Sequence, residues 1–189
     1  MLDAARALLV ERGYAATTVA DIATAAGVAP ATVNAAFGGK SGVLKHLIDI
    51  AIVGDDQPVP LAERDSVAAI AAEPDARRQC AMLAALVADV HERLGPLQDV
   101  LVQASGADPQ VRRQVDEANQ GRHAGMAEFV ACVEPEALAA GLTAGQATDA
   151  VWALTDARLY LGLVVERGWS KDDYVQWLGS QLAAALLAD

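Results

Sequence analysis

Apolar positions recur with a helical period along almost the whole chain. In residues 19–26, for example, Val19, Ile22, Ala23 and Ala26 fall at i, i+3, i+4 and i+7, which is one face of a helix. No stretch alternates apolar and polar residues for long, and no Asn-Gly or Asp-Gly pair marks a hairpin turn. The pattern therefore predicts an all-α fold of nine or ten helices.

The first quarter of the chain predicts four short helices in a tight arrangement. Gly13 is a plausible stop for the first helix, and Thr18 with Asp21 three residues later is typical of a helix start. Gly27 suits a tight turn, and Pro30 suits the first position of the third helix. Within this third helix, Val33, Ala36 and Phe37 are expected to point inward. The expected helices are 2–13, 19–26, 30–37 and 40–53. This is the pattern of a helix-turn-helix, with residues 30–37 as the recognition helix.

The segment GDDQPVP, residues 54–60, predicts a linker because it holds two prolines, a glycine and two aspartates. We therefore expect a DNA-binding domain at 1–53 and a second domain at 54–189. Helical patterns in the second domain are expected at 61–72, 75–94, 96–106, 109–133, 144–167 and 171–187. Residues 143–146 and 170–173 resemble helix-start boxes for the last two.

The charge is unevenly distributed. The chain has a net charge of −11, yet residues 1–50 hold four basic and four acidic side chains, so the whole excess lies in residues 51–189. Because the N-terminal domain is neutral and the second domain is acidic, only the N-terminal domain would approach DNA. No apolar run reaches membrane-spanning length and no signal peptide is evident, so we expect a cytoplasmic protein.

The sequence offers no catalytic or metal-binding constellation. Cys80 and Cys132 stand in helical patterns and are interpreted as small apolar residues, and the three histidines are far apart. We expect no enzyme activity, no metal and no cofactor.

The predicted recognition helix carries no charged residue, but this does not exclude DNA reading. Its outward residues would be Ala31, Thr32, Asn34 and Ala35, which are small enough to enter a major groove. Asn can pair with adenine through two hydrogen bonds, and alanine and threonine methyl groups can contact the thymine methyl group. Phosphate contacts would then come from the helix starts at Thr18 and Lys40.

The segment LDAARALLVERGYAATTVADIATAAGVAPATVNAAFGGKSGVLKHLI, residues 2–48, resembles the first four helices of the TetR/AcrR family of bacterial transcriptional regulators. The resemblance implies a homodimer that binds an operator on double-stranded DNA and a small-molecule effector. It implies a helix-turn-helix head, a helical ligand-binding and dimerisation bundle, and repression relieved by the effector. It further assigns Thr18 and Lys40 to phosphates, and Thr32 with its neighbours to base edges.

Several residues depart from the family pattern. Ala20, Asn34 and Ala36 stand where the family often has Arg, Tyr and His, and Ala29 and Gly39 stand where Ser is frequent. The sequence starts directly at Met1-Leu2-Asp3, so either the basic arm that often precedes the first helix is missing or the start is misplaced. These changes remove phosphate contacts, so we expect weaker DNA binding than is usual in the family.

Two apolar helices near the C-terminus predict the dimer interface. The expected interface residues are Leu161, Val165, Tyr174, Leu178 and Leu182, although an ordinary monomer core would give the same pattern.

Polar residues interrupt apolar stripes in the predicted helices 109–133 and 144–167. Arg122 and Asp156 lie at these interruptions, and they predict a ligand site together with Asn119, Met126 and Trp152. A structural Arg–Asp pair would explain the same two residues.

An alternative function remains open on the sequence alone. The weak head and the acidic body also fit a helical small-molecule-binding protein whose DNA-binding head has decayed.

Overall fold

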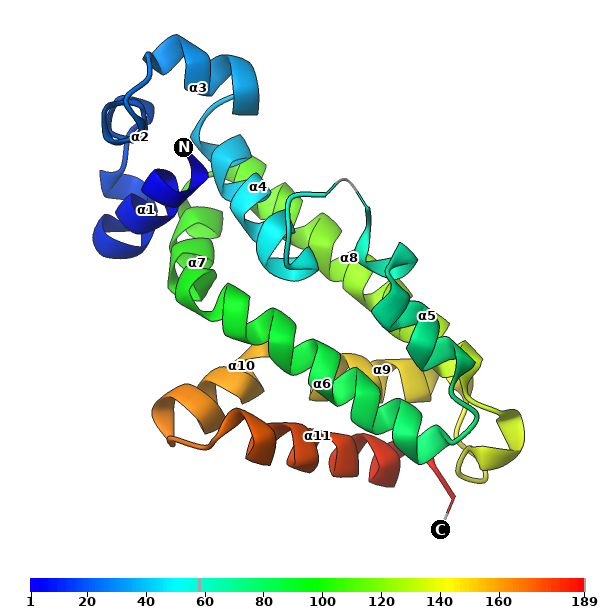
Figure 1. The fold of residues 1–189 in the computed structure, drawn as a ribbon. Helices are drawn as coiled ribbons and strands as arrows, with labels where there is room; N and C mark the ends of the chain where they lie inside the picture. The colour runs from blue at the N-terminus through cyan, green and yellow to red at the C-terminus, as the bar shows by residue number, and fades with distance from the viewer. Residues whose placement is uncertain (58, 189) are drawn as a thin grey trace. The chain divides into compact units, whose positions relative to one another are not determined.

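The computed structural model describes residues 1–57 and 59–188, and the regular elements in these ranges are helices (Figure 1). The only strand-like feature in the described ranges is an isolated antiparallel bridge between Leu138 and Leu187. The all-α prediction is confirmed. Within the same ranges, no helix is both long and apolar enough to cross a membrane.

The helices follow one another along the chain with short connections. They are α1 (Leu2–Ala16), α2 (Val19–Ala26), α3 (Pro30–Phe37), α4 (Lys40–Val53), α5 (Asp65–Ala72), α6 (Ala76–Leu94), α7 (Gln98–Ala107), α8 (Pro109–Cys132), α9 (Ala144–Leu154), α10 (Ala157–Tyr160) and α11 (Lys171–Leu186). Short 3₁₀ turns η1 (Leu61–Glu63), η2 (Gly95–Leu97) and η3 (Pro135–Ala137) punctuate them, and a π-helical segment, η4 (Leu161–Glu166), follows α10.

The chain forms two compact units. Unit 1 comprises Met1–Asp56 and Arg93–Ala118, and unit 2 comprises the described part of 57–92 and 119–189. Both α6 and α8 therefore contribute residues to each unit.

Unit 1 has an aliphatic core that joins the first four helices to α7 and the start of α8. Leu8 and Leu9 of α1 pack there with Val100 of α7 and Val111 of α8. The chain turns at Gly13, whose φ of 80° is available to glycine at little cost, and helical hydrogen bonding resumes to Ala16. The predicted stop at Gly13 is thus a kink within α1.

Unit 2 is built around α6, α8, α9 and α11, whose buried side chains form one cluster. The helices α6 and α11 approach closely, because a Cβ added at Gly179 would lie 3.2 Å from the Cα of Ala81. A larger residue at position 179 would push these two helices apart.

The expected continuous helix over 144–167 is wrong. Helix α9 ends at Leu154, and Asp156 adopts extended backbone angles and caps α10 by accepting a hydrogen bond from the backbone N–H of Arg158. The hydroxyl of Thr155 donates a hydrogen bond to the carbonyl of Val151 at 2.8 Å. Side chains that bond to nearby backbone in this way compete with the helical pattern, which explains the break.

Candidate nucleic-acid interface and ligand site

The recognition helix α3 is held to the unit 1 core by two side chains. Val33 is fully buried, and Phe37, one turn later, is half-buried against the same core. Ala31, Thr32, Asn34 and Ala35 are all exposed, so the predicted DNA-reading face is accessible. Ala36, expected to point inward, is also exposed, because Val33 and Phe37 alone cover the contact with the core.

The turn before α3 has the geometry that its sequence predicts. Gly27 takes the left-handed conformation, with φ 67° and ψ 32°, and its N–H bonds to the carbonyl of Thr24 at 3.2 Å. The N–H of Val28 bonds to Ala23 at 3.0 Å. These bonds end α2 and fix the direction in which the chain enters α3.

The helix starts around α3 differ in how they are capped. Neither Ala29, before α3, nor Gly39, before α4, supplies a side-chain cap, as the sequence indicated. Thr18, before α2, forms a full capping box with Asp21: its Oγ1 accepts from the Asp21 N–H, and its own N–H donates to Asp21 Oδ2 at 2.9 Å. This bonding lowers the pKa of Asp21, with the hydroxyl of Thr18 as the largest cause.

Lys40 is anchored inside unit 1. Its Nζ donates to the backbone carbonyl of Tyr14 at 2.6 Å and lies 4.0 Å from the centre of the Tyr14 ring. The Tyr14 hydroxyl in turn donates to Oδ2 of Asp108, at the start of α8, at 2.7 Å. Partial burial lowers the pKa of Lys40, while Asp108 opposes the shift. An ammonium group has three N–H donors, so Lys40 keeps two for a phosphate.

Two residues hold α4 in place, and the sequence analysis did not identify either of them. Gly42 has no room for a side chain, since a Cβ there would overlap the carbonyl oxygen of Phe37. At the other end, Nε and Nη2 of Arg93 donate to the carbonyls of Ala51 and Ile52 at 2.7 and 3.2 Å. A positive charge at a helix C-terminus also interacts favourably with the helix dipole. No local pattern signals either role, because both depend on a long-range contact or a close approach.

The predicted ligand residues of unit 2 fall into two groups. Asn119 is exposed, whereas Arg122, Met126, Trp152 and Asp156 are half-buried. The guanidinium of Arg122 stacks 4.5 Å from the centre of the Trp152 ring, and its Nη1 donates to the Trp152 carbonyl at 2.7 Å and to the Thr155 hydroxyl at 3.2 Å.

Asp156 does not form the Arg–Asp pair with Arg122 that the sequence left open. Its carboxylate binds Arg158 instead, with Oδ1 2.8 Å from Nε. The hydrogen bonds from Arg158 are the largest cause that lowers the pKa of Asp156.

Sequence reasoning missed His91 and assigned Tyr174 a different role. Both are buried in unit 2 with a polar atom that has no partner among the described residues, namely Nδ1 of His91 and the hydroxyl of Tyr174. Burial lowers the pKa of His91 to about 4, so its imidazole is neutral near pH 7. Tyr160 lies between them, with ring centres 5.8 Å from His91 and 5.0 Å from Tyr174.

The residues predicted for the dimer interface differ in accessibility. Val165 is 66% exposed and Leu161 is half-buried, so both can contact a second copy. Tyr174, Leu178 and Leu182 have no exposed surface, because α11 turns these side chains into the core of unit 2. That burial corrects the interface assignment of these three residues and leaves the opposite side of α11 as the accessible one.

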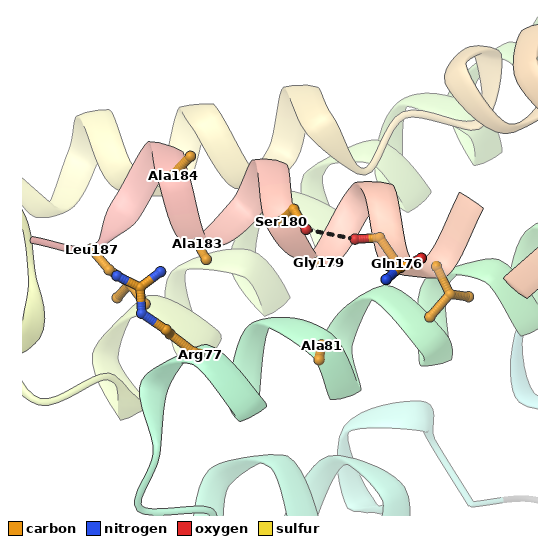
Figure 2. A pocket seen from close by; sticks show the side chains of 9 residues that line it. Arg77, Ala81, Gln176, Gly179, Ser180, Ala183, Ala184 and Leu187 are labelled. Carbon is orange, nitrogen blue, oxygen red and sulfur yellow. Dashed lines mark hydrogen bonds between the residues drawn. The ribbon is translucent and has the colours of Figure 1, made fainter. Parts of the chain in front are cut away.

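A shallow groove of about 450 Å³ lies between α6 and α11 (Figure 2). Its floor is made by small residues, including Ala81, Gly179 and Ala183, and Arg77 and Gln176 stand at its edges. None of the predicted ligand residues lines it.

Comparison with known proteins agrees with this geometry. Residues 1–47 match the family model for bacterial regulatory proteins of the tetR family. A search of curated protein sequences gave no match.

Solved structures resemble the chain over nearly its full length. A protein described as a transcriptional regulator from Saccharomonospora viridis, in complex with choline, superposes with a TM-score of 0.70 at 20% identity, over 100% of this chain and 96% of that one. A TetR-family regulator from Mesorhizobium loti gives 0.69 at 18%, over 97% and 92%. The SmeT–triclosan complex gives 0.69 at 20%, over 100% and 90%. At these identities the likeness establishes the fold.

The chain thus has the fold of a bacterial transcriptional regulator, with a helix-turn-helix head and a helical bundle. Its N-terminal residues 1–47 are similar to bacterial regulatory proteins of the tetR family.

Proposed function

We propose that the chain is a ligand-responsive regulator that binds a specific DNA operator and represses transcription until a small molecule releases it. The observation that carries the proposal is the exposed, uncharged face of α3, which consists of Ala31, Thr32, Asn34 and Ala35. In the major groove, Asn34 would pair with adenine, and the methyl groups of this face would contact thymine. In this proposal residues 1–53 read DNA, and residues 54–189 bind the ligand and dimerise.

Thr18 and Lys40 would contact phosphates. The two free N–H groups of Lys40 support this role, and the Tyr14 carbonyl fixes where its ammonium lies. Thr18 has a competitor, because its hydroxyl donates to Asp21 Oδ2 at 2.6 Å and must leave that carboxylate to donate to a phosphate. We therefore assign Lys40 the larger share of phosphate binding.

Homodimerisation would place two α3 helices in successive major grooves about 34–36 Å apart. The accessible residues for this contact are Val165 and Leu161, together with the outer side of α11, where Gln176, Ser180 and Ala184 are accessible. Small side chains there would let two helices approach closely around a two-fold axis.

The effector would bind in unit 2 beside Arg122 and weaken DNA binding. By linkage, DNA must weaken effector binding by the same factor, and such coupling is typically about 1–3 kcal/mol. Equal effector affinity with and without operator DNA would remove the switch from this proposal.

Selection from a random duplex library tests the DNA-reading role, because it requires no assumption about the operator sequence. We expect a palindromic site for the wild type. Asn34→Ala should relax the preference at one base pair per half-site, at a cost of about 1–3 kcal/mol. Lys40→Ala should weaken binding to all sequences alike. It should also reduce the salt slope, which is the slope of the logarithm of the binding constant against the logarithm of the salt concentration, by about 1 per subunit.

Lys45→Ala is the matched control for Lys40→Ala. Lys45 is also on α4, but its side chain is exposed and paired with Asp49 at 2.6 Å. If Lys40→Ala altered the selected sequence and left the salt slope unchanged, the roles of Lys40 and Asn34 would be wrongly assigned.

A second candidate is a helical small-molecule-binding protein whose head no longer reads DNA. It is favoured by the internal bonding of the two phosphate candidates, Lys40 to Tyr14 and Thr18 to Asp21. Failure to enrich any sequence at low salt, with the protein dimeric and folded, would select this candidate over the regulator.

A further inference from the structure

Three buried side-chain atoms in the described part of the chain have no hydrogen-bond partner, and all three belong to unit 2. They are Nδ1 of His91, Nε1 of Trp152 and the hydroxyl of Tyr174. His91 is 7% exposed and Tyr174 has no exposed surface. Buried polar groups are normally paired, so three such atoms in one unit call for a functional explanation.

These atoms belong to one group of side chains, which we call the interior polar cluster: His91, Arg122, Trp152 and Tyr174. Arg122 stacks on Trp152, and the ring of Tyr160 contacts both His91 and Tyr174. The charges of Arg122 and Asp156 both act on the pKa of His91, and Asp156 also acts on that of Tyr174. Ring contacts thus join His91, Tyr160 and Tyr174, and the charge of Arg122 is felt at His91.

Arg122 brings to this cluster a positive charge that forms no direct ion pair with a described residue. Its Nη1 binds Trp152 and Thr155, which are neutral, while its Nε and Nη2 have no partner among the described residues. No carboxylate of those residues lies within 4.0 Å of it, because Asp156 is paired with Arg158. Burial is the largest cause that lowers the pKa of Arg122. A half-buried guanidinium in this state gains from an anion.

We propose that the interior polar cluster binds the carboxylate of a small monocarboxylic acid, with the free Nε–Nη2 edge of Arg122 as its anchor. The regulatory meaning of this site rests on the function proposed above. The guanidinium edge matches the two oxygens of a planar carboxylate. The indole N–H of Trp152 and the hydroxyl of Tyr174 are two further buried donors without a partner among the described residues, and a bound acid could use them.

The charge of the cluster favours a carboxylate over a phosphate. His91 is neutral at pH 7 and Arg158 is held by Asp156, so one cation faces the ligand. A monoanion is neutralised by one guanidinium, whereas a phosphate dianion would keep an unpaired charge in a partly buried site. The aromatic rings of Trp152 and Tyr160 and the thioether of Met126 suit an apolar remainder.

The local backbone gives independent support. The helix breaks between α9 and α10 at Thr155–Asp156, and there the Trp152 carbonyl accepts a hydrogen bond from Arg122. The π-helical η4 follows one turn later. π-helical turns occur frequently at functional sites. Both irregularities lie in the segment that carries Trp152 and Tyr160, so the cluster sits where the backbone is least regular.

Calorimetry and thermal melting of the full chain test the proposal with matched ligands. The probes are the straight-chain acids from butyrate to octanoate and phenylacetate, with hexanamide, phenylacetamide and phenylphosphonate as comparisons. We expect at least one acid to bind and raise the melting temperature. Its amide or phosphonate counterpart should bind at least tenfold more weakly.

Variants separate a binding role from a structural one. Arg122→Gln should reduce acid affinity at least tenfold, while Arg113→Gln, an exposed arginine on the same helix, should leave it unchanged. Tyr174→Phe removes only the unpaired hydroxyl. It should weaken acid binding several-fold while leaving the melting temperature of the free protein unchanged or higher. A merely structural hydroxyl would not give that combination.

The proposal is overturned if no acid of the series binds at millimolar concentration, or if amides or the phosphonate bind equally well. It is also overturned if Arg122→Gln and Tyr174→Phe both bind the acids normally. DNA binding is measured separately. If an acid binds but does not change the affinity for the selected DNA sequence, the carboxylate site stands and the proposed switch is wrong. If the protein selects a DNA sequence but binds no acid, the regulator stands and the carboxylate site is wrong.

Discussion

The hydrogen bond between Tyr14 and Asp108 should hold α1 to the start of α8, and Tyr14→Phe tests it with the smallest possible change. The substitution removes the hydroxyl that donates to Asp108 Oδ2 at 2.7 Å and keeps the ring over which Lys40 lies. The buried Tyr14 ring, 4% exposed, should pack as before. The loss is therefore that of one hydrogen bond between two segments far apart in the chain.

The magnitude follows from the type of bond. A hydrogen bond to a charged group contributes about 1.5–3 kcal/mol to stability. The Asp108 carboxylate is open to solvent on one side, which weakens the bond, so we expect a loss of about 1–2 kcal/mol. Asp108→Asn should cost a similar amount, because the Asn side-chain oxygen can still cap α8 by accepting the hydrogen bond that the Gln110 N–H donates to Oδ1, while the charge that strengthens the Tyr14 bond is lost.

The pH dependence has a definite sign. The bond from Tyr14, followed by the backbone N–H of Gln110, lowers the pKa of Asp108 below its ordinary value near 4. A carboxyl group with a lowered folded-state pKa stabilises the protein above its unfolded pKa, and that stability is lost as pH falls through the folded one. Tyr14→Phe should therefore lose less stability than the wild type as the pH falls below the ordinary pKa of an aspartate.

Urea unfolding followed by two probes provides the assay. All three tryptophans, at positions 152, 169 and 177, lie in unit 2, so fluorescence reports that unit while far-ultraviolet circular dichroism reports both. We expect Tyr14→Phe to lower the dichroism midpoint more than the fluorescence midpoint. A double-mutant cycle with Asp108→Asn should give a coupling of about 1 kcal/mol. Coupling below about 0.3 kcal/mol would refute the assigned bond.

Three further substitutions have clear expected outcomes. Gly42→Ala should destabilise unit 1 by at least about 2 kcal/mol in urea unfolding, because its Cβ would overlap the Phe37 carbonyl. Arg93→Met should cost about 1–2 kcal/mol and increase hydrogen exchange in the last turn of α4; unchanged exchange there would contradict the capping role. Val165→Glu should give folded monomers by light scattering, whereas Leu178→Glu should lose helical dichroism because its side chain is fully buried.

Local features of the fold were predictable from the sequence. The capping boxes Thr18–Asp21 and Thr143–Gln146 and the left-handed turn at Gly27 formed as expected, since each depends on residues within one helical turn. The recognition helix kept its predicted bounds for the same reason. Its DNA-reading residues are exposed, but their contacts with bases stay a prediction.

Long-range features were not predictable from a single pattern. The apolar stripe through residue 156 predicted a continuous helix, but the short carboxylate of Asp156 bonds better to the Arg158 N–H and ends it. A helix apolar on two sides does not reveal which side faces its own core, and for this reason Tyr174, Leu178 and Leu182 were placed in an interface. Lys40 meets Tyr14 only after folding, so its anchoring left no trace in its neighbours along the chain.

The discontinuous composition of unit 1 limits how such a head can be exchanged between proteins. A recombination breakpoint at the linker of residues 54–60 would transfer α1–α4 without Leu97, Val100 and Val111, which complete their core. The transferred piece would also lose Asp108 and Arg93, and it would carry an uncovered apolar face into its new host. A gene fusion that preserves the fold of α1–α4 must therefore also bring α7 and the first turns of α8.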